Sequence, residues 1–176
     1  MKVQLAALIL CILVFTSGCA TYMVTHELER PISPGTCKVV AIQSALPATQ
    51  DEEDLPREQE ISKLLTTLED AVRKTGLFTA VEPFLDTSTY VVKATIITFK
   101  RGSGAVRALI GFGVGNAKIT VEIKLIERNS DAVLFSGNFS QEISDWTEAG
   151  DKMYGKIARD FGMALKKRAD ALSKST

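Results

Sequence analysis

The sequence predicts a two-layer α+β sandwich, in which two amphipathic helices cover one face of a mixed five-stranded sheet. Three observations favour this class. Residues 90–143 contain three runs rich in β-branched residues, the composition of strands. Two longer segments, near residues 57–75 and 148–172, repeat apolar residues at intervals of three and four. The predicted order, β-α-β-β-β-β-α, lets both helices bury their apolar stripes against the same sheet.

The chain begins with a segment typical of export signals. Lys2 precedes an apolar run, Leu5 to Phe15, that is shorter than the roughly 20 residues a transmembrane helix needs. Small residues follow the run, as at a signal-peptide cleavage site. The sequence TSGC, ending at Cys19, resembles the lipobox of bacterial lipoproteins. The resemblance implies that residues 1–18 are a signal peptide and that Cys19 is acylated, with palmitate among the expected chains; ordinary secretion with an incidental cysteine is the alternative.

The membrane and the domain boundaries follow from the same region. The second residue of the expected mature chain is Ala20 and not Asp. By analogy with lipoprotein sorting in enterobacteria, this favours an outer-membrane anchor facing the periplasm, with another cell-envelope membrane as the alternative. Residues 19–36 are expected to form an acylated tether, because Pro31 and Pro34 interrupt any regular element. A single α+β domain is expected over residues 37–173.

The first strand and helix of this domain are predicted from the next segment. Lys38–Leu46 is expected to be a buried strand. Arg57–Thr75 is expected to be a helix, with Gly76 as its C-cap. The apolar stripe of this helix consists of Ile61, Leu64, Leu65, Leu68, Ala71 and Val72.

Four further strands are expected after the helix. Gly76–Phe84 is predicted as a short strand and Tyr90–Lys100 as a longer one. Ala117–Glu127 alternates apolar and polar residues, which indicates a strand with one buried and one solvent-exposed face. It should form a hairpin with Ala132–Ile143 through the turn-forming residues Arg128–Asp131. In the last strand the residues expected to share the buried face are Val133, Phe135, Phe139 and Ile143.

The last predicted element is a helix over about Glu148–Leu172. Its apolar side is marked by Tyr154, Ile157, Ala158, Phe161, Leu165 and Leu172. Glycine in a helix costs up to about 1 kcal/mol relative to alanine. Close packing is therefore expected at Gly150, Gly155 and Gly162.

The segment Arg101–Asn116, RGSGAVRALIGFGVGN, contains five glycines between apolar residues. A phosphate-binding loop would need a dinucleotide fingerprint or a Gly-Lys-Ser/Thr motif at the start of a helix. Here GFGVGN is followed by a predicted strand and no such lysine is present, which argues against nucleotide binding.

The remaining composition argues against several other functions. The chain has 21 basic and 21 acidic residues, and this balance disfavours a nucleic-acid partner. The single histidine, His26, falls in the expected tether, and catalytic or metal-binding motifs are absent. The protein is therefore expected to be no enzyme and to bind no cofactor or metal.

The glycine-rich segment is the candidate contact region. Exposure of its apolar side chains to water would cost free energy unless something covers them. The segment could fold back over its own sheet, contact another protein or contact the membrane. The candidate contact residues are Arg107, Leu109, Ile110, Phe112 and Val114.

Two stretches, GLFTAVEPF and RALIGFGVGNAKITVEIKLIERNSDAVLFSGNFS, resemble a bacterial lipoprotein family catalogued as domain of unknown function number 4410. The resemblance covers residues 36–172 and carries no established activity. More distantly, the element order is similar to the small α/β domains of envelope lipoproteins that act by protein contact. We therefore expect a membrane-anchored lipoprotein that is a non-catalytic protein-interaction or assembly module, with an envelope protein or a second copy as partner. A lipid-binding or transport lipoprotein and an oligomeric secretion component are the alternatives.

Overall fold

The fold was analysed in a computed structural model, which describes residues 21–43, 56–82, 87–101, 116–143 and 150–174. The described strands and helices follow one another in the order β1, β2, α2, β3, β4, β5, β6, α4. Their bounds are Thr21–His26, Thr36–Gln43, Glu58–Thr75, Ala80–Val81, Tyr90–Lys100, Ala117–Glu127, Ala132–Ile143 and Gly150–Ser173.

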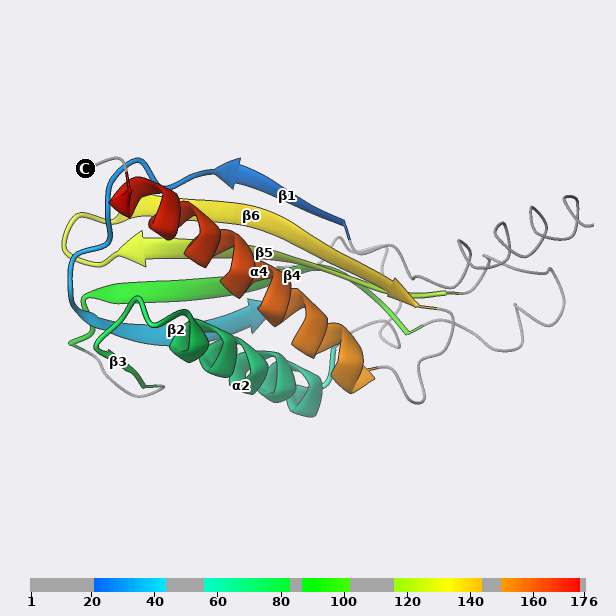
Figure 1. The fold of residues 1–176 in the computed structure, drawn as a ribbon. Helices are drawn as coiled ribbons and strands as arrows, with labels where there is room; N and C mark the ends of the chain where they lie inside the picture. Colours follow the sequence, from blue (N-terminus) through cyan, green and yellow to red (C-terminus); the bar gives the residue numbers. More distant parts are fainter. Residues whose placement is uncertain (1–20, 44–55, 83–86, 102–115, 144–149, 175–176) are drawn as a thin grey trace, which may run out of the picture.

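The strands form one mixed sheet with the order β1-β6-β5-β4-β2-β3. Strand β2 is parallel to β3 and β4, whereas the other neighbours are antiparallel. The expected hairpin of β5 and β6 is confirmed by a register that runs from Ala117–Ile143 to Glu127–Ala132. Both helices lie on one face of the sheet, side by side, with α2 near β2 and α4 near β6 (Figure 1). The α+β class with two helices on one face is thus confirmed.

The sheet has six strands, and the expectation of five was wrong because β1 lies in the region predicted to be a tether. Strand β1 pairs with the edge of β6, and the Tyr22 ring stacks on Phe139 with ring centroids 5.7 Å apart. Beyond β1, Leu28 is buried, and its carbonyl oxygen accepts a hydrogen bond of 2.9 Å from Arg168 of α4. Apolar burial and these contacts hold residues 21–36 on the domain.

The core lies between the helices and the sheet. Strands β4 and β5 point alternate residues into it, because successive side chains of a strand face opposite sides of the sheet. Cys37 is fully buried there, as expected for a core cysteine, and burial raises the pKa of its thiol to about 12. The largest fully buried side chains are Tyr90, Tyr154, Phe99, Phe135, Phe139, Phe161, Leu28, Leu64, Leu68, Ile96, Ile119 and Ile123.

Two details of the sequence prediction are corrected by the packing. A bulge in the β5–β6 pairing between Leu125 and Ile126 shifts the phase of β6, so Val133 is exposed while Phe135 is buried. In α4, a Cβ added to Gly162 would lie 3.4 Å from the carbonyl oxygen of Ala71, which is the expected close helix packing. At Gly155 no atom lies within 4 Å of an added Cβ, so the expectation of close packing was wrong there.

Helix α2 has well-defined ends. The Glu60 carboxylate accepts a hydrogen bond of 2.6 Å from the backbone N–H of Arg57, which satisfies a donor ahead of the first turn. Gly76 closes the helix with a φ of 69°, a left-handed conformation that favours glycine and matches the predicted C-cap.

Candidate functional site

The residues that the sequence singles out as functional lie outside the described part of the chain. Cys19 precedes it, and the glycine-rich segment falls within residues 102–115. The structure therefore describes the residues on either side of that segment, Arg101 at the end of β4 and Asn116 before β5. The candidate residues in this position are Arg107, Leu109, Ile110, Phe112 and Val114.

Arg101, the residue that borders the segment on the β4 side, contacts helix α2. The Arg101 guanidinium forms an ion pair of 2.8 Å with Glu60, and both side chains are largely buried, with 22% and 16% exposed. The same guanidinium lies 5.5 Å from the centroid of the Phe99 ring. Because Glu60 also caps α2, one carboxylate joins the end of β4 to the start of the helix.

The border on the β5 side is held to β6. Asn116 donates a side-chain hydrogen bond of 3.1 Å to the carboxylate of Glu142. Lys100 and Lys118 are opposite each other at the last pairs of the β4–β5 ladder. The chain thus leaves and re-enters the sheet at adjacent points on the two central strands.

Strand β1 begins at this same end of the sheet. Thr21 is opposite Ser140 of β6, and Ser140 is opposite Thr120 of β5, only three residues from the start of that strand. Figure 1 shows the start of β1 and the ends of β4 and β6 at the right of the molecule. We call this end, defined by Thr21, Lys100, Ala117 and Ile143, the loop end of the sheet.

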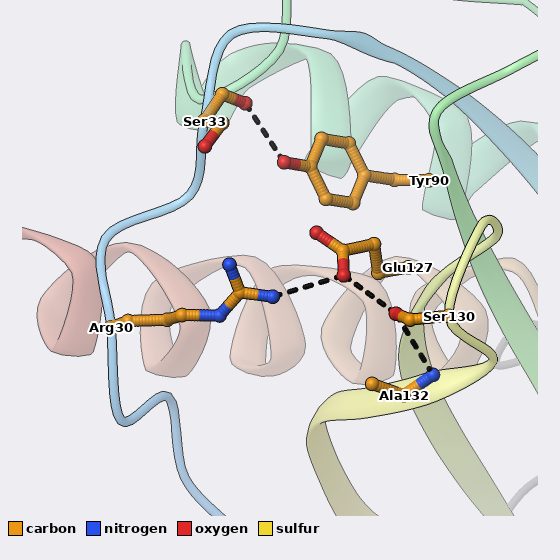
Figure 2. A network of polar contacts seen from close by, with 6 residues as sticks. All are labelled: Arg30, Ser33, Tyr90, Glu127, Ser130 and Ala132. Carbon is orange, nitrogen blue, oxygen red and sulfur yellow. Dashed lines mark hydrogen bonds and ion pairs between the residues drawn. The ribbon is translucent and has the colours of Figure 1, made fainter.

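The segment between β1 and β2 is fastened at the opposite end. Arg30 donates a hydrogen bond of 2.9 Å to the Glu127 carboxylate, which also accepts one of 2.6 Å from Ser130 (Figure 2). The Ser130 hydrogen bond and the Arg30 charge lower the pKa of Glu127. The Tyr90 hydroxyl donates to the carbonyl oxygen of Ser33 at 3.0 Å. These contacts join residues 30–33 to β4 and to the β5–β6 turn.

A groove lies between α2 and α4 on the side away from the sheet. Its volume is about 410 Å³, within the range of small-molecule sites. Small residues allow the groove to form, and basic side chains dominate its rim. The groove is lined by Thr67, Asp70, Ala71, Lys74, Thr75, Gly155, Ala158, Arg159, Gly162, Met163 and Lys166.

Other kinds of site find little basis in the described residues. Among them, no three His, Cys, Asp or Glu side chains are grouped so that they could hold a metal ion. The thiol of Cys37 is fully buried and its pKa is raised, which disfavours the reactive thiolate. No helix in the described ranges is long and apolar enough to span a membrane.

Solved bacterial structures share the fold. PelC from Paraburkholderia phytofirmans, solved as a dodecamer, matches with a TM-score of 0.51 and 13% identity over 84% of this chain and 99% of PelC. A DUF330 protein from Xanthomonas campestris matches with a TM-score of 0.52 and 15% identity over 88% of this chain and 97% of that one. At such identities the likeness shows the fold alone. No curated protein sequence matches this chain.

A family model agrees with the resemblance seen in the strand sequences. The model is described as a domain of unknown function, DUF4410, and it matches residues 33–160. The match begins just before β2 and ends inside α4, so it spans most of the described fold. The chain therefore belongs to the DUF4410 family.

Proposed function

We propose that this protein is a membrane-anchored lipoprotein of the cell envelope that acts by non-catalytic protein contact or assembly. Its candidate contact region is the glycine-rich segment 101–116. The observation that carries the proposal is the position of the borders of this segment at the loop end, where β1 also begins.

The position matters because of the short distance to the proposed anchor. Cys19 precedes Thr21 by two residues, which span about 7 Å in extended conformation. Acyl chains on Cys19 would therefore hold the loop end of the domain close to the membrane surface. The 17 residues that follow Cys19 in the expected tether, residues 20–36, would have allowed a separation of roughly 55–60 Å.

This arrangement gives the apolar segment a restricted set of partners. Arg101 and Asn116 fix the borders of the segment at the loop end of the sheet, which the proposed anchor would hold near the membrane. Leu109, Ile110 and Phe112 would there contact another anchored protein, a second copy or the bilayer itself. Anchoring in one membrane raises the effective concentration of such partners without any new contact.

Self-association is one form of this function that the fold supports. PelC, which shares the fold, is a dodecamer. An oligomeric secretion component therefore stays a candidate within the same class of assembly proteins.

Lipid binding is the second candidate function, and the groove between α2 and α4 favours it. Ala71 and Met163 give the groove an apolar lining, and Lys74, Arg159 and Lys166 supply a basic rim for an anionic head group. The space between helices and sheet is a less suitable place, because the core side chains there, such as those of Leu64 and Phe161, are fully buried and packed together.

The proposal is tested by photo-crosslinking in intact cells. A photoreactive residue replaces Phe112, and a matched control replaces Asn129, which is exposed in the β5–β6 turn at the opposite end of the sheet. A discrete protein adduct at residue 112 alone, identified by mass spectrometry, is the expected result. Lipid adducts at residue 112 would indicate membrane contact instead, and only intramolecular products would overturn the proposal.

A further inference from the structure

Strand β1 is the longer of the two outer strands of the sheet. The outer strand on the other side, β3, has two residues, whereas β1 has six. Proteins protect exposed strand edges with charged residues or proline, because a free edge can pair with another chain. Thr21–His26, TYMVTH, contains no Asp, Glu, Lys, Arg or Pro. Its pairing with β6 has a register shift between Val24 and His26, which comes after Tyr22 and Met23. Tyr22 and Met23 are also 49% and 59% exposed.

The backbone direction of β1 identifies the groups at its outer edge. A Cβ added to Gly137 of β6 would lie 3.0 Å from the carbonyl oxygen of Met23, so that oxygen points toward β6. Successive residues of an antiparallel strand direct their N–H and C=O groups to alternate sides. Tyr22 and Val24 therefore direct their N–H and C=O groups to the outer edge, where no described residue pairs with them.

We propose that two copies of the chain pair through β1 around a two-fold axis at Met23. The antiparallel register would place Tyr22 opposite Val24 of the second copy, and Val24 opposite Tyr22. Because both residues direct their N–H and C=O groups outward, the two pairs would exchange four hydrogen bonds. The result is one continuous sheet of twelve strands, six from each copy.

The side chains suit this register. Met23 would meet Met23 of the second copy in a non-hydrogen-bonded pair, the type that brings side chains closest together. The Tyr22 and Val24 pairs would each join an aromatic and a β-branched residue, a favourable cross-strand combination. Tyr22 and Met23, which are exposed in the single chain, would each gain a cross-strand neighbour.

A second copy is a better occupant of this edge than another surface of the fold. The edge is self-complementary, since the two-fold axis pairs the outward groups of Tyr22 with those of Val24 in the second copy, and no charges repel across it. A head-to-tail arrangement would need β1 to pair with the opposite edge, where β3 covers only Thr36 and Cys37 of β2 and the next residue of β2 is the charged Lys38. The inference rests on the proposed assembly function and specifies both partner and strand.

The test is disulfide formation in intact cells with the full chain, anchored as it occurs. In the proposed register the two copies of residue 23 have Cα atoms about 4.5 Å apart, within reach of a disulfide. Residue 22 lies opposite residue 24 of the second copy, so the two copies of residue 22 are two positions apart along the strands. Their Cα atoms would be roughly 8 Å apart, which is too far for a disulfide. Met23→Cys should therefore give a crosslinked dimer on a non-reducing gel, and the matched control Tyr22→Cys should not.

A second pair of variants tests the hydrogen bonds. Val24→Pro removes an outward N–H and leaves the inward groups of Met23 in place, whereas Val24→Thr keeps the N–H. In the Met23→Cys background, Val24→Pro should abolish the crosslinked band and Val24→Thr should retain it, with protease resistance confirming that each chain is folded. Absence of the Met23→Cys dimer, equal crosslinking at residues 22 and 23, or persistence of the dimer with Val24→Pro would each overturn the inference. The Phe112 experiment is independent of these outcomes and decides the proposed function separately.

Discussion

The addition of one methyl group to glycine should have opposite effects at two places in this fold. At Gly137 in β6, an added Cβ would lie 3.0 Å from the carbonyl oxygen of Met23 and 3.1 Å from the Phe139 ring. At Gly155 in α4, nothing lies within 4 Å of the added atom. Gly137→Ala and Gly155→Ala therefore compare the same chemical change in a crowded and an open environment.

The expected free energies differ in sign. In the open helix position, alanine is favoured over glycine, so Gly155→Ala should raise the free energy of unfolding by about 1 kcal/mol. At Gly137 alanine also reduces the entropy of the unfolded chain, by about 0.5–1 kcal/mol, but forcing a methyl into a packed site costs about 1–3 kcal/mol. We expect Gly137→Ala to lower the free energy of unfolding by about 1–2 kcal/mol, because the neighbour is backbone.

Urea unfolding measures both changes, and amide hydrogen exchange locates the second. Each kcal/mol corresponds to about 2–4 °C in Tm for a domain of 150–250 residues. Gly137→Ala should also speed exchange of the Met23 amide, which faces β6, more than exchange in the centre of β5. A stabilised Gly137→Ala variant, or unchanged exchange in β1, would refute the close approach of β1 to β6 and the backbone direction inferred from it.

Three further changes have defined outcomes. Ser130 and Arg30 lower the pKa of Glu127, so this carboxylate stabilises the fold above its unfolded pKa and the stabilisation is lost as the pH falls. The Tm difference between wild type and Glu127→Gln should therefore shrink from pH 7 toward pH 3; a constant difference would contradict the ion pair. Burial raises the pKa of Glu69, which opposes folding of the charged form, so Glu69→Gln should be more stable at pH 7, with the gain vanishing near pH 4. With a thiol pKa of about 12, Cys37 should react with maleimide only on unfolding, as peptide mass spectrometry would show; labelling of the native protein within minutes would contradict its burial.

The central strands were the most predictable part of the fold. The predicted bounds of β4, β5 and β6 agree with the structure, because each strand is long and flanked by turn-forming residues or glycines. The helices also agree to within two residues, since their apolar stripes extend over several turns. Long periodic patterns thus determined most of the sheet and both helices.

The missed strand β1 and the wrong burial of Val133 both depend on tertiary contacts. Strand β1 has only six residues and is followed by Pro31 and Pro34. Because these prolines disfavour regular structure, the whole segment was predicted to be a tether. Its stability comes from pairing with β6 and from buried Leu28, which no local pattern reveals. The exposure of Val133 depends on a bulge, which shifts side-chain phase without a signal in composition.

The candidate contact region could be delimited from the sequence, but its location in space could not. Glycine content identified the segment between Arg101 and Asn116, and the register of β4 and β5 then gave the positions of those two residues. The proximity of this segment to the start of β1 depends on the β1–β6 pairing. Sequence reasoning missed that pairing and therefore placed the domain too far from the proposed anchor.

The short connection between Cys19 and β1 also has a consequence for orientation. A domain on a long flexible linker can rotate freely, but one whose first strand starts two residues after an acylated cysteine has little rotational freedom. Strand β6, with twelve residues, is about 40 Å long. If Cys19 is acylated, the loop end of each copy would lie near the lipid. In the dimer paired through β1, the two loop ends point in opposite directions along the sheet. Both anchors could then reach one membrane only if the strands lie along its surface, and the length of β6 would set how much of that surface each copy covers.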